Sequence, residues 1–165
     1  MANKFLRAIA LILALGMMLS FGACAKKTKP DEETIPNAAG ADQNATGDSD
    51  QGKAMGLQTV HFPYDAFTFD EEAKTTLKAN ADILKTEKSA KIQIEGHCDQ
   101  RGGIQYNIAL GEKRANATKK YLVDLGVSAN RVTTISFGKE RPIDPATTEE
   151  AYGKNRRANF VITSH

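Results

Sequence analysis

The sequence predicts a two-layer α+β domain in which helices cover one side of a mixed β-sheet. Four segments show the strand period or a short run of strand-forming residues, and two longer segments repeat apolar residues with the period of a helix. The order β-α-β-α-β-(α)-β alternates strands with helices, which favours such layers. The domain should span residues 57–165, a length that can bury one core.

The first strand is expected at residues 60–64, where apolar residues alternate with His61 and Pro63. Because Pro63 has no amide donor, this strand should lie at an edge of the sheet or end there. The first helix follows. Asp70 has the character of an N-cap with acidic residues after it, and apolar residues recur on one face until about Thr86.

The remaining elements follow the same patterns. The second helix should run from about Gly103 to Leu125, because Gly126 is a typical residue just past a helix end. The other segments are a second strand at 91–95, a third strand at 132–137, a short helix at 149–155 and a final strand at 157–163.

The N-terminus has the features of an export signal. Lys4 and Arg7 precede a short apolar run at residues 8–19, which is shorter than the roughly 20 residues of a membrane span. Small residues then stand directly before Cys24, as in the lipobox of bacterial lipoproteins, although Phe21 occupies a position where leucine is usual. This resemblance predicts a signal peptide at 1–23, with cleavage before Cys24.

Acylation of Cys24 would anchor the chain in a membrane. Each buried methylene of an acyl chain contributes roughly 0.8 kcal/mol, so several chains hold a protein permanently. Ala25 after the cysteine favours the outer membrane over the inner one. The alternative is ordinary secretion, with Cys24 as a free or disulfide-bonded thiol.

Residues 24–56 are expected to form a flexible linker after the lipidated cysteine. They are rich in Gly, Pro, Asp, Asn and Ser and almost free of large apolar side chains, a composition typical of disorder. A flexible coil of this length spans roughly 30 Å on average and about 100 Å when fully extended. Such a linker could reach across a gap between two cell-envelope layers.

Charge and cysteine content exclude other classes. The formal net charge is +2, and removal of Lys4 and Arg7 with the signal brings it near zero, so the balance does not indicate a nucleic-acid partner. The only other cysteine is Cys98, which has no intramolecular partner once Cys24 is acylated. Stability must then come from a packed core and not from disulfides.

The turn after the second strand and the helix that follows it carry the candidate binding residues. Asp99 lies in this turn, and Asn107, Leu110 and Arg114 share one face of the helix because they are three and four residues apart. A fixed carboxylate and a fixed guanidinium could together hold a ligand that carries both an ammonium and a carboxylate. A plain ion pair between Asp99 and Arg114 is the alternative, and their spacing leaves both open.

Three segments carry a family resemblance. EGHCDQRGGIQYNIALGEKRANATKKYL, together with SFGKERP and AYGKNRRANF, closely resembles the lipoprotein members of the OmpA-like domain family, over about residues 60–161. The resemblance implies non-covalent binding of the peptide stem of peptidoglycan through meso-diaminopimelate. It also implies that Asp99 accepts the ligand ammonium and that Arg114 holds the carboxylate.

The same resemblance implies further site residues. Tyr64 and Asp65 should border the pocket, Arg101 and Leu110 should line it, and Asn107 should fix the turn. One departure concerns Gly103 and Ile104, which stand where Thr-Pro often starts the helix. Without the cap and the preset φ, each worth up to about 1 kcal/mol, the helix start should be looser.

The resemblance also implies partners and a location. The lipid anchor would sit in the outer membrane of a Gram-negative bacterium, with the domain in the periplasm. The protein would tether that membrane to the cell wall and would contact TolB and other Tol proteins during envelope constriction at cell division. A Tol-independent cell-wall-binding lipoprotein or surface antigen is the alternative.

Catalysis, cofactors and metals are not expected. No nucleophile with a base and an orienting group stands out. Glu95, His97 and Asp99 alternate along a strand with Cys98 facing away, which disfavours a joint metal site. His97 is expected to be a hydrogen-bonded structural residue and Cys98 a small buried side chain. The basic residues Lys154, Arg156 and Arg157 are expected to form a solvated face.

Overall fold

The computed structural model describes residues 46–165. Its strands are β1 (Gly47–Asp48), β2 (Val60–His61), β3 (Lys91–His97), β4 (Val132–Gly138) and β5 (Arg157–Ser164), and its α-helices are α1 (Glu71–Thr86), α2 (Ile104–Asp124) and α3 (Glu149–Asn155). Two short 3₁₀ helices, η2 (Ser49–Gln51) and η3 (Ala129–Arg131), complete the order. The expected signal peptide, Cys24 and most of the linker lie outside the described residues.

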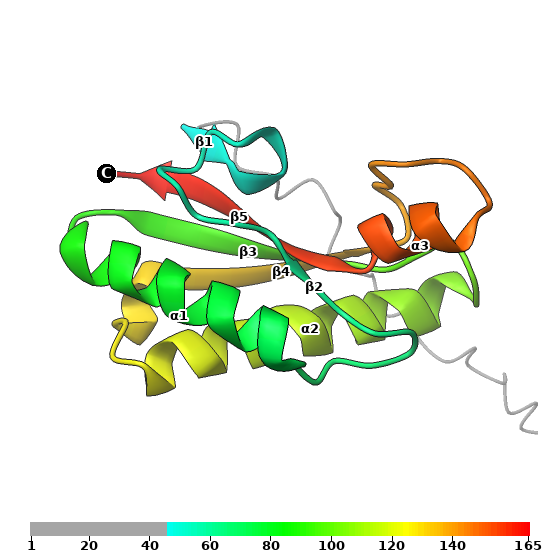
Figure 1. The fold of residues 1–165 in the computed structure, drawn as a ribbon, viewed down its shortest axis with the longest axis horizontal. Helices are drawn as coiled ribbons and strands as arrows, with labels where there is room; N and C mark the ends of the chain where they lie inside the picture. The colour runs from blue at the N-terminus through cyan, green and yellow to red at the C-terminus, as the bar shows by residue number, and fades with distance from the viewer. Residues whose placement is uncertain (1–45) are drawn as a thin grey trace, which may run out of the picture. The chain divides into compact units, whose positions relative to one another are not determined.

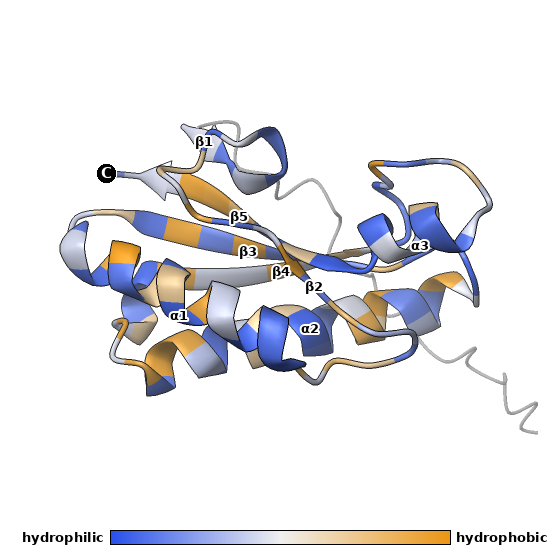
Figure 2. Cartoon of the chain, in the orientation of Figure 1, coloured by the Kyte–Doolittle hydropathy of each residue, from blue (hydrophilic) through white to orange (hydrophobic). Residues whose placement is uncertain are grey.

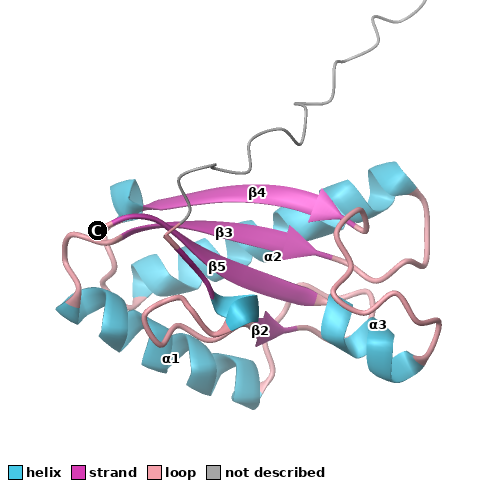
Figure 3. Cartoon of the chain, turned by 90° about the horizontal axis from the view of Figure 1, so that it is seen from above, coloured by secondary structure: helices cyan, strands magenta, loops and turns pink. Residues whose placement is uncertain are grey.

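The strands form one mixed sheet. β5 pairs antiparallel with β3, and it also pairs antiparallel with β1 and β2, while β3 and β4 are parallel. α1 and α2 lie side by side against one face of the sheet, and α3 lies beyond one end of it (Figures 1 and 3). The predicted two-layer α+β fold is therefore confirmed.

Local signals set most element boundaries. Asp70 caps α1, because its Oδ1 accepts the amide of Ala73 at 2.8 Å. β2 ends before Pro63, as a residue without an amide donor requires. α2 is followed by Gly126 at φ +99°, a conformation that glycine adopts without strain. Gly103 stands at the N-cap of α2 and provides no side-chain hydrogen bond, as expected.

The core lies between the sheet and the two long helices. Apolar residues on the strands face apolar residues on α1 and α2, and Figure 2 shows their alternation with polar residues along β3. Leu77, Leu84 and Leu122 of the helices pack in one cluster with Ile94 and Phe160 of the strands, and all five are fully buried. Each such side chain stabilises the fold by roughly 1.5–3 kcal/mol.

Two glycines let α2 approach the sheet closely. A Cβ on Gly96 of β3 would lie 1.9 Å from the carbonyl oxygen of Gly111 on α2, and a Cβ on Gly111 would lie 2.3 Å from Ser136 Oγ on β4. Only glycine at both positions permits this contact. The contact places the first half of α2 against the end of β3, from which the turn carrying Asp99 emerges.

The expected start of the domain at residue 57 is wrong. Residues 46–56 are folded: β1 pairs with β5, and the side chain of Ala54 is buried in the core. Asp50 forms an ion pair with the buried Arg157, with Arg157 Nε 2.7 Å from Asp50 Oδ2. The polar composition that predicted disorder reflects tertiary hydrogen bonds and ion pairs, which local composition does not reveal.

Candidate functional site

A cavity of about 170 Å³ opens at the end of β3. The β3–α2 turn, the first half of α2, the loop after β2 and the C-terminal end of α3 surround it. All seven residues expected at the site line this one cavity: Tyr64, Asp65, Asp99, Arg101, Asn107, Leu110 and Arg114. Cys98, Gly102, Tyr106 and Arg156 complete the lining.

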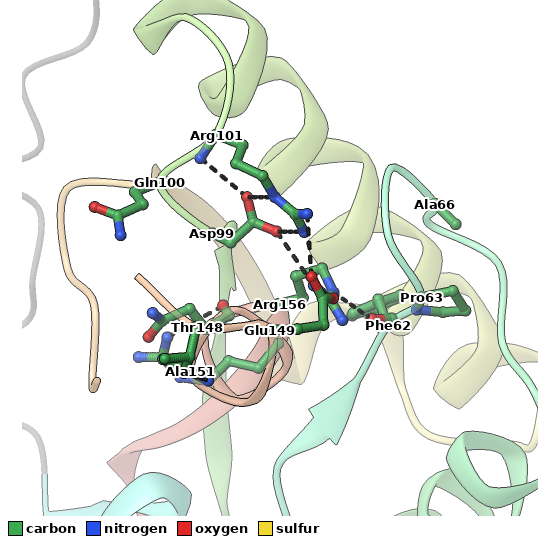
Figure 4. A network of polar contacts seen from close by, with 12 residues as sticks. Phe62, Pro63, Ala66, Asp99, Gln100, Arg101, Thr148, Glu149, Ala151 and Arg156 are labelled. Carbon is green, nitrogen blue, oxygen red and sulfur yellow. Dashed lines mark hydrogen bonds and ion pairs between the residues drawn. The ribbon is translucent and has the colours of Figure 1, made fainter. Parts of the chain in front are cut away.

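Asp99 is the best-connected carboxylate of the cavity, and only 4 % of its surface is exposed. Its Oδ1 accepts the backbone amide of Arg101 at 3.0 Å and Arg101 Nε at 3.3 Å. Its Oδ2 accepts Arg101 Nη2 at 2.7 Å and Arg156 Nη1 at 3.3 Å. Figure 4 shows Asp99 between these two guanidinium groups. The carboxylate is thus fixed in position by the two arginines.

The surroundings keep Asp99 ionised. Burial, the largest single influence, would raise the pKa of its carboxyl group, but the hydrogen bonds from Arg101 and Arg156 together outweigh it. The pKa of Asp99 therefore lies below its ordinary value. A carboxylate held in this form can accept an ammonium group near neutral pH.

Arg101 is held by aromatic rings and by a second carboxylate. Its guanidinium lies 4.1 Å from the ring centre of Tyr64 and 4.4 Å from that of Tyr152. Its Nη1 donates to Glu149 at 3.1 Å, so Arg101 bridges Asp99 and Glu149. Because a third of its side chain is exposed, Arg101 forms the solvent-facing wall of the cavity.

Arg114 does not meet Asp99, and the plain ion pair between them is wrong for the described residues. Arg114 is fully buried and donates to three main-chain carbonyls: Nε to Ala66 and Nη1 to His97, both at 2.8 Å, and Nη2 to Pro63 at 3.2 Å. A guanidinium has five N–H groups, and these three carbonyls take up one on each nitrogen, so Nη1 and Nη2 each have one more N–H. Burial lowers the pKa of Arg114, but arginine stays charged in proteins.

The remaining predicted residues shape the cavity. Asn107 donates from Nδ2 to the carbonyl of Arg101 at 2.7 Å and so fixes the turn. Asp65 has the left-handed φ of +53° and accepts a hydrogen bond from the hydroxyl of Tyr106, which raises the pKa of that phenol. Leu110 supplies an apolar wall. Both Asp65 and Tyr106 are therefore held at the rim.

Sequence reasoning missed the part that α3 plays. Lys154, Arg156 and Arg157 do not form a solvated face, because Arg157 is buried and the Arg156 side chain is only 11 % exposed. Arg156 joins Asp99 to Glu149, with Nη1 2.8 Å from Glu149 Oε1. The AYGKNRRANF segment indicated this region, but adjacent basic residues do not reveal that Arg156 pairs with Asp99 while Arg157 pairs with Asp50.

His97 and Cys98 lie below the turn. Cys98 is buried as expected, and burial raises the pKa of its thiol to about 11, which makes it inert. His97 is buried against the ring of Phe137, and its Nε2 lies 3.5 Å from Glu95 Oε2. This long contact is the nearest counterpart of the expected hydrogen bond, because neither ring nitrogen has a well-aligned partner within residues 46–165. Nowhere in that range do three His, Cys, Asp or Glu side chains gather as metal ligands would.

Comparison with known proteins agrees with this architecture. The OmpA family matches residues 61–156, which include every strand and helix around the cavity. The chain belongs to the OmpA family. Within it, the chain is 37 % identical to the peptidoglycan-associated lipoprotein of Mesorhizobium japonicum, over 92 % of this chain and 90 % of the relative. It is 36 % identical to the protein of the same name from Haemophilus influenzae, over 94 % and 97 %.

Solved structures give the same result. The crystal structure of the peptidoglycan-associated lipoprotein from Burkholderia pseudomallei is 36 % identical and superposes with a TM-score of 0.61, covering 63 % of this chain and 88 % of that one. The C-terminal domain of Helicobacter pylori MotB superposes with a TM-score of 0.62 at 22 % identity, covering 67 % and 87 %, a likeness of fold alone. None of the helices within residues 46–165 has the length and apolar content needed to cross a bilayer.

Proposed function

We propose that the domain binds the peptide stem of peptidoglycan through meso-diaminopimelate in the cavity beside Asp99. The observation that carries the proposal is a small cavity with a fixed carboxylate on one wall and guanidinium groups on the others. The cavity holds about 170 Å³ and is lined by both acidic and basic side chains, which suits a small group that carries both charges. Names of the relatives support a peptidoglycan ligand.

The cavity offers a group of opposite charge to each charged end of the ligand. The ammonium would bind Asp99, which is kept ionised by its neighbours. The carboxylate would bind the N–H groups of Arg114 that do not face main-chain carbonyls, and Arg101, which also lines the cavity, would add a second positive charge. Charge-assisted hydrogen bonds at both ends would fix orientation as well as affinity. No step of this function breaks a covalent bond.

We further propose that lipid on Cys24 anchors the chain in the outer membrane, so that cell-wall binding tethers that membrane. Residues 24–45 would then form a shorter linker than expected, about 70 Å when fully extended. Many anchored copies beside a polymeric ligand would act at high effective concentration, so a single site can be weak. TolB is the expected protein partner, and its co-purification with the chain from envelope extracts would separate this proposal from a Tol-independent lipoprotein.

A pull-down with purified sacculi tests wall binding. Full-length chain should sediment with sacculi and be released by free meso-diaminopimelate, whereas Asp99→Asn, which keeps the shape and removes the charge, should stay in the supernatant. Asp144→Asn is a matched control, because Asp144 pairs with Lys154 outside the cavity. Release of soluble muropeptides during the incubation would instead indicate an enzyme. Equal sedimentation of wild type and Asp99→Asn would mean that the wall contact lies elsewhere.

A further inference from the structure

The hydrogen bonds of Asp99 leave no acceptor position for a ligand. An ionised carboxylate offers about four lone-pair positions. Three are filled by Arg101, through its backbone amide, Nε and Nη2, and the fourth by Arg156 Nη1. An ammonium group therefore cannot bind Asp99 until at least one guanidinium moves away.

Arg101 is the guanidinium that can move. Arg156 is fixed, since its side chain is 11 % exposed and its Nε donates to the carbonyl of Phe62 at 3.1 Å. Arg101 is a third exposed, and the rings of Tyr64 and Tyr152 contact it without a hydrogen bond. Glu149, itself 66 % exposed, already accepts Arg101 Nη1 and could keep the displaced side chain paired (Figure 4).

We infer that the Asp99–Arg101 ion pair is a latch that makes the pocket select for ligands with two opposite charges. This inference rests on the proposed function and concerns how that site discriminates. Opening the latch breaks two side-chain hydrogen bonds to a charged group, those from Nε and Nη2, and the cost must be offset by new ones. A ligand ammonium restores contacts to Asp99 only, which leaves Arg101 without part of its pairing.

A zwitterionic ligand replaces the broken hydrogen bonds of both Asp99 and Arg101. Its ammonium takes the place of the guanidinium on Asp99, and its carboxylate gives Arg101 and Arg114 a new acceptor. A ligand with an ammonium alone offers no acceptor to Arg101, so the closed pair competes with it successfully. The latch thus excludes simple amines although the cavity contains an ionised carboxylate.

Two stem peptides that differ at one residue test the latch. One carries meso-diaminopimelate and the other L-lysine, which has the same side-chain ammonium but lacks the side-chain carboxylate. Calorimetry with the full-length chain should show binding of the first peptide and at most very weak binding of the second. Arg101→Gln should bind the lysine peptide at least about tenfold more tightly than wild type does, because the competing guanidinium is gone. Arg141→Gln, a change of the same kind outside this cavity, should behave as wild type.

The direction of the change separates the latch from a simple ligand contact. If Arg101 only holds the ligand carboxylate, Arg101→Gln weakens binding of the diaminopimelate peptide and leaves the lysine peptide unbound, and the latch is overturned while the proposed function stands. If wild type binds neither peptide, the proposed function fails and the latch fails with it. In wild type, the Nε–H resonance of Arg101 should also shift with the diaminopimelate peptide and not with the lysine peptide, a readout that needs no variant.

Discussion

Arg157 of β5 and Asp50 of the N-terminal segment form a buried ion pair, with Arg157 Nε 2.7 Å from Asp50 Oδ2. Side-chain exposure is 3 % for the arginine and 11 % for the aspartate. The same segment places Ser49 Oγ 2.7 Å from Asn159 Oδ1, and the amide of Phe160 donates to that hydroxyl at 2.9 Å, so several polar contacts hold the segment to the sheet. Residues that look like linker in the sequence therefore belong to the folded domain.

Breaking this ion pair should destabilise the domain strongly. Asp50→Ala leaves the Arg157 guanidinium buried without its carboxylate, a change that typically costs about 3–5 kcal/mol. Urea unfolding of wild type and variant measures the loss. A matched control is Asp124→Ala, because Asp124 forms an exposed pair with Lys120 and should cost less than about 1 kcal/mol. Equal losses for both variants would show that the buried pair has no special weight.

The position of the domain boundary can be tested by truncation. A chain that begins at residue 57 lacks Asp50 and the buried Ala54, whereas one that begins at residue 46 keeps both. We expect the shorter chain to melt at a lower temperature, and its amides in β5 to exchange faster, because β1 no longer pairs with them. Identical melting of the two chains would restore the boundary that composition alone predicts.

The close contact between α2 and the sheet predicts opposite effects of the same substitution at two glycines. Gly111→Ala should destabilise by about 1–3 kcal/mol or more, because its Cβ would lie 2.3 Å from Ser136 Oγ and 2.8 Å from the carbonyl oxygen of Gly96. Gly153→Ala in α3 makes the same chemical change where the nearest atom is 3.6 Å away. It should stabilise by up to about 1 kcal/mol, as alanine does in a helix. Thermal unfolding should thus shift in opposite directions for the two variants.

His97 should make stability fall in mild acid. Burial lowers the pKa of its imidazole from the ordinary value of 6.5, against the opposing influence of Glu95. The unfolded chain then binds a proton more readily than the folded chain, so the free energy of unfolding decreases as pH falls below 6.5. One proton contributes at most about 1.4 kcal/mol per pH unit.

Urea unfolding of wild type and His97→Leu between pH 7 and pH 5 isolates this effect. The variant keeps an apolar side chain against Phe137 and should show the shallower slope. His61 titrates in the same range with a lowered pKa, but it contributes equally to both proteins. Parallel slopes would mean that His97 does not take up a proton on unfolding in this range.

The sequence predicted the long elements well because local chemistry determines them. Asp70 marks the start of α1, Gly126 marks the end of α2, and Pro63 excludes a longer β2. The seven residues that the sequence marked as a site also line one cavity, since Asp99 and Arg114 lie on neighbouring elements. What local chemistry could not give is which charged groups pair.

Pairing depends on segments far apart in the chain. Arg156 lies 57 residues from Asp99, and only the end of β5 and α3 brings it to the turn. Arg114 was expected to face Asp99, but it donates to three main-chain carbonyls instead. The pattern of side chains in a sequence does not show where main-chain carbonyls will lie in the fold. The same limit hid Asp50, whose partner is 107 residues away.

The most direct test of the central proposal is an NMR titration of ¹⁵N-labelled chain with a stem peptide that carries meso-diaminopimelate. We expect amide shifts to be confined to the cavity, at residues 64–65, 98–102, 106–110 and 156, and to disappear in Asp99→Asn. Shifts that are unchanged in Asp99→Asn, or that cluster around another cavity such as the one lined by Gln58, Asp70 and Thr76, would contradict the proposed site.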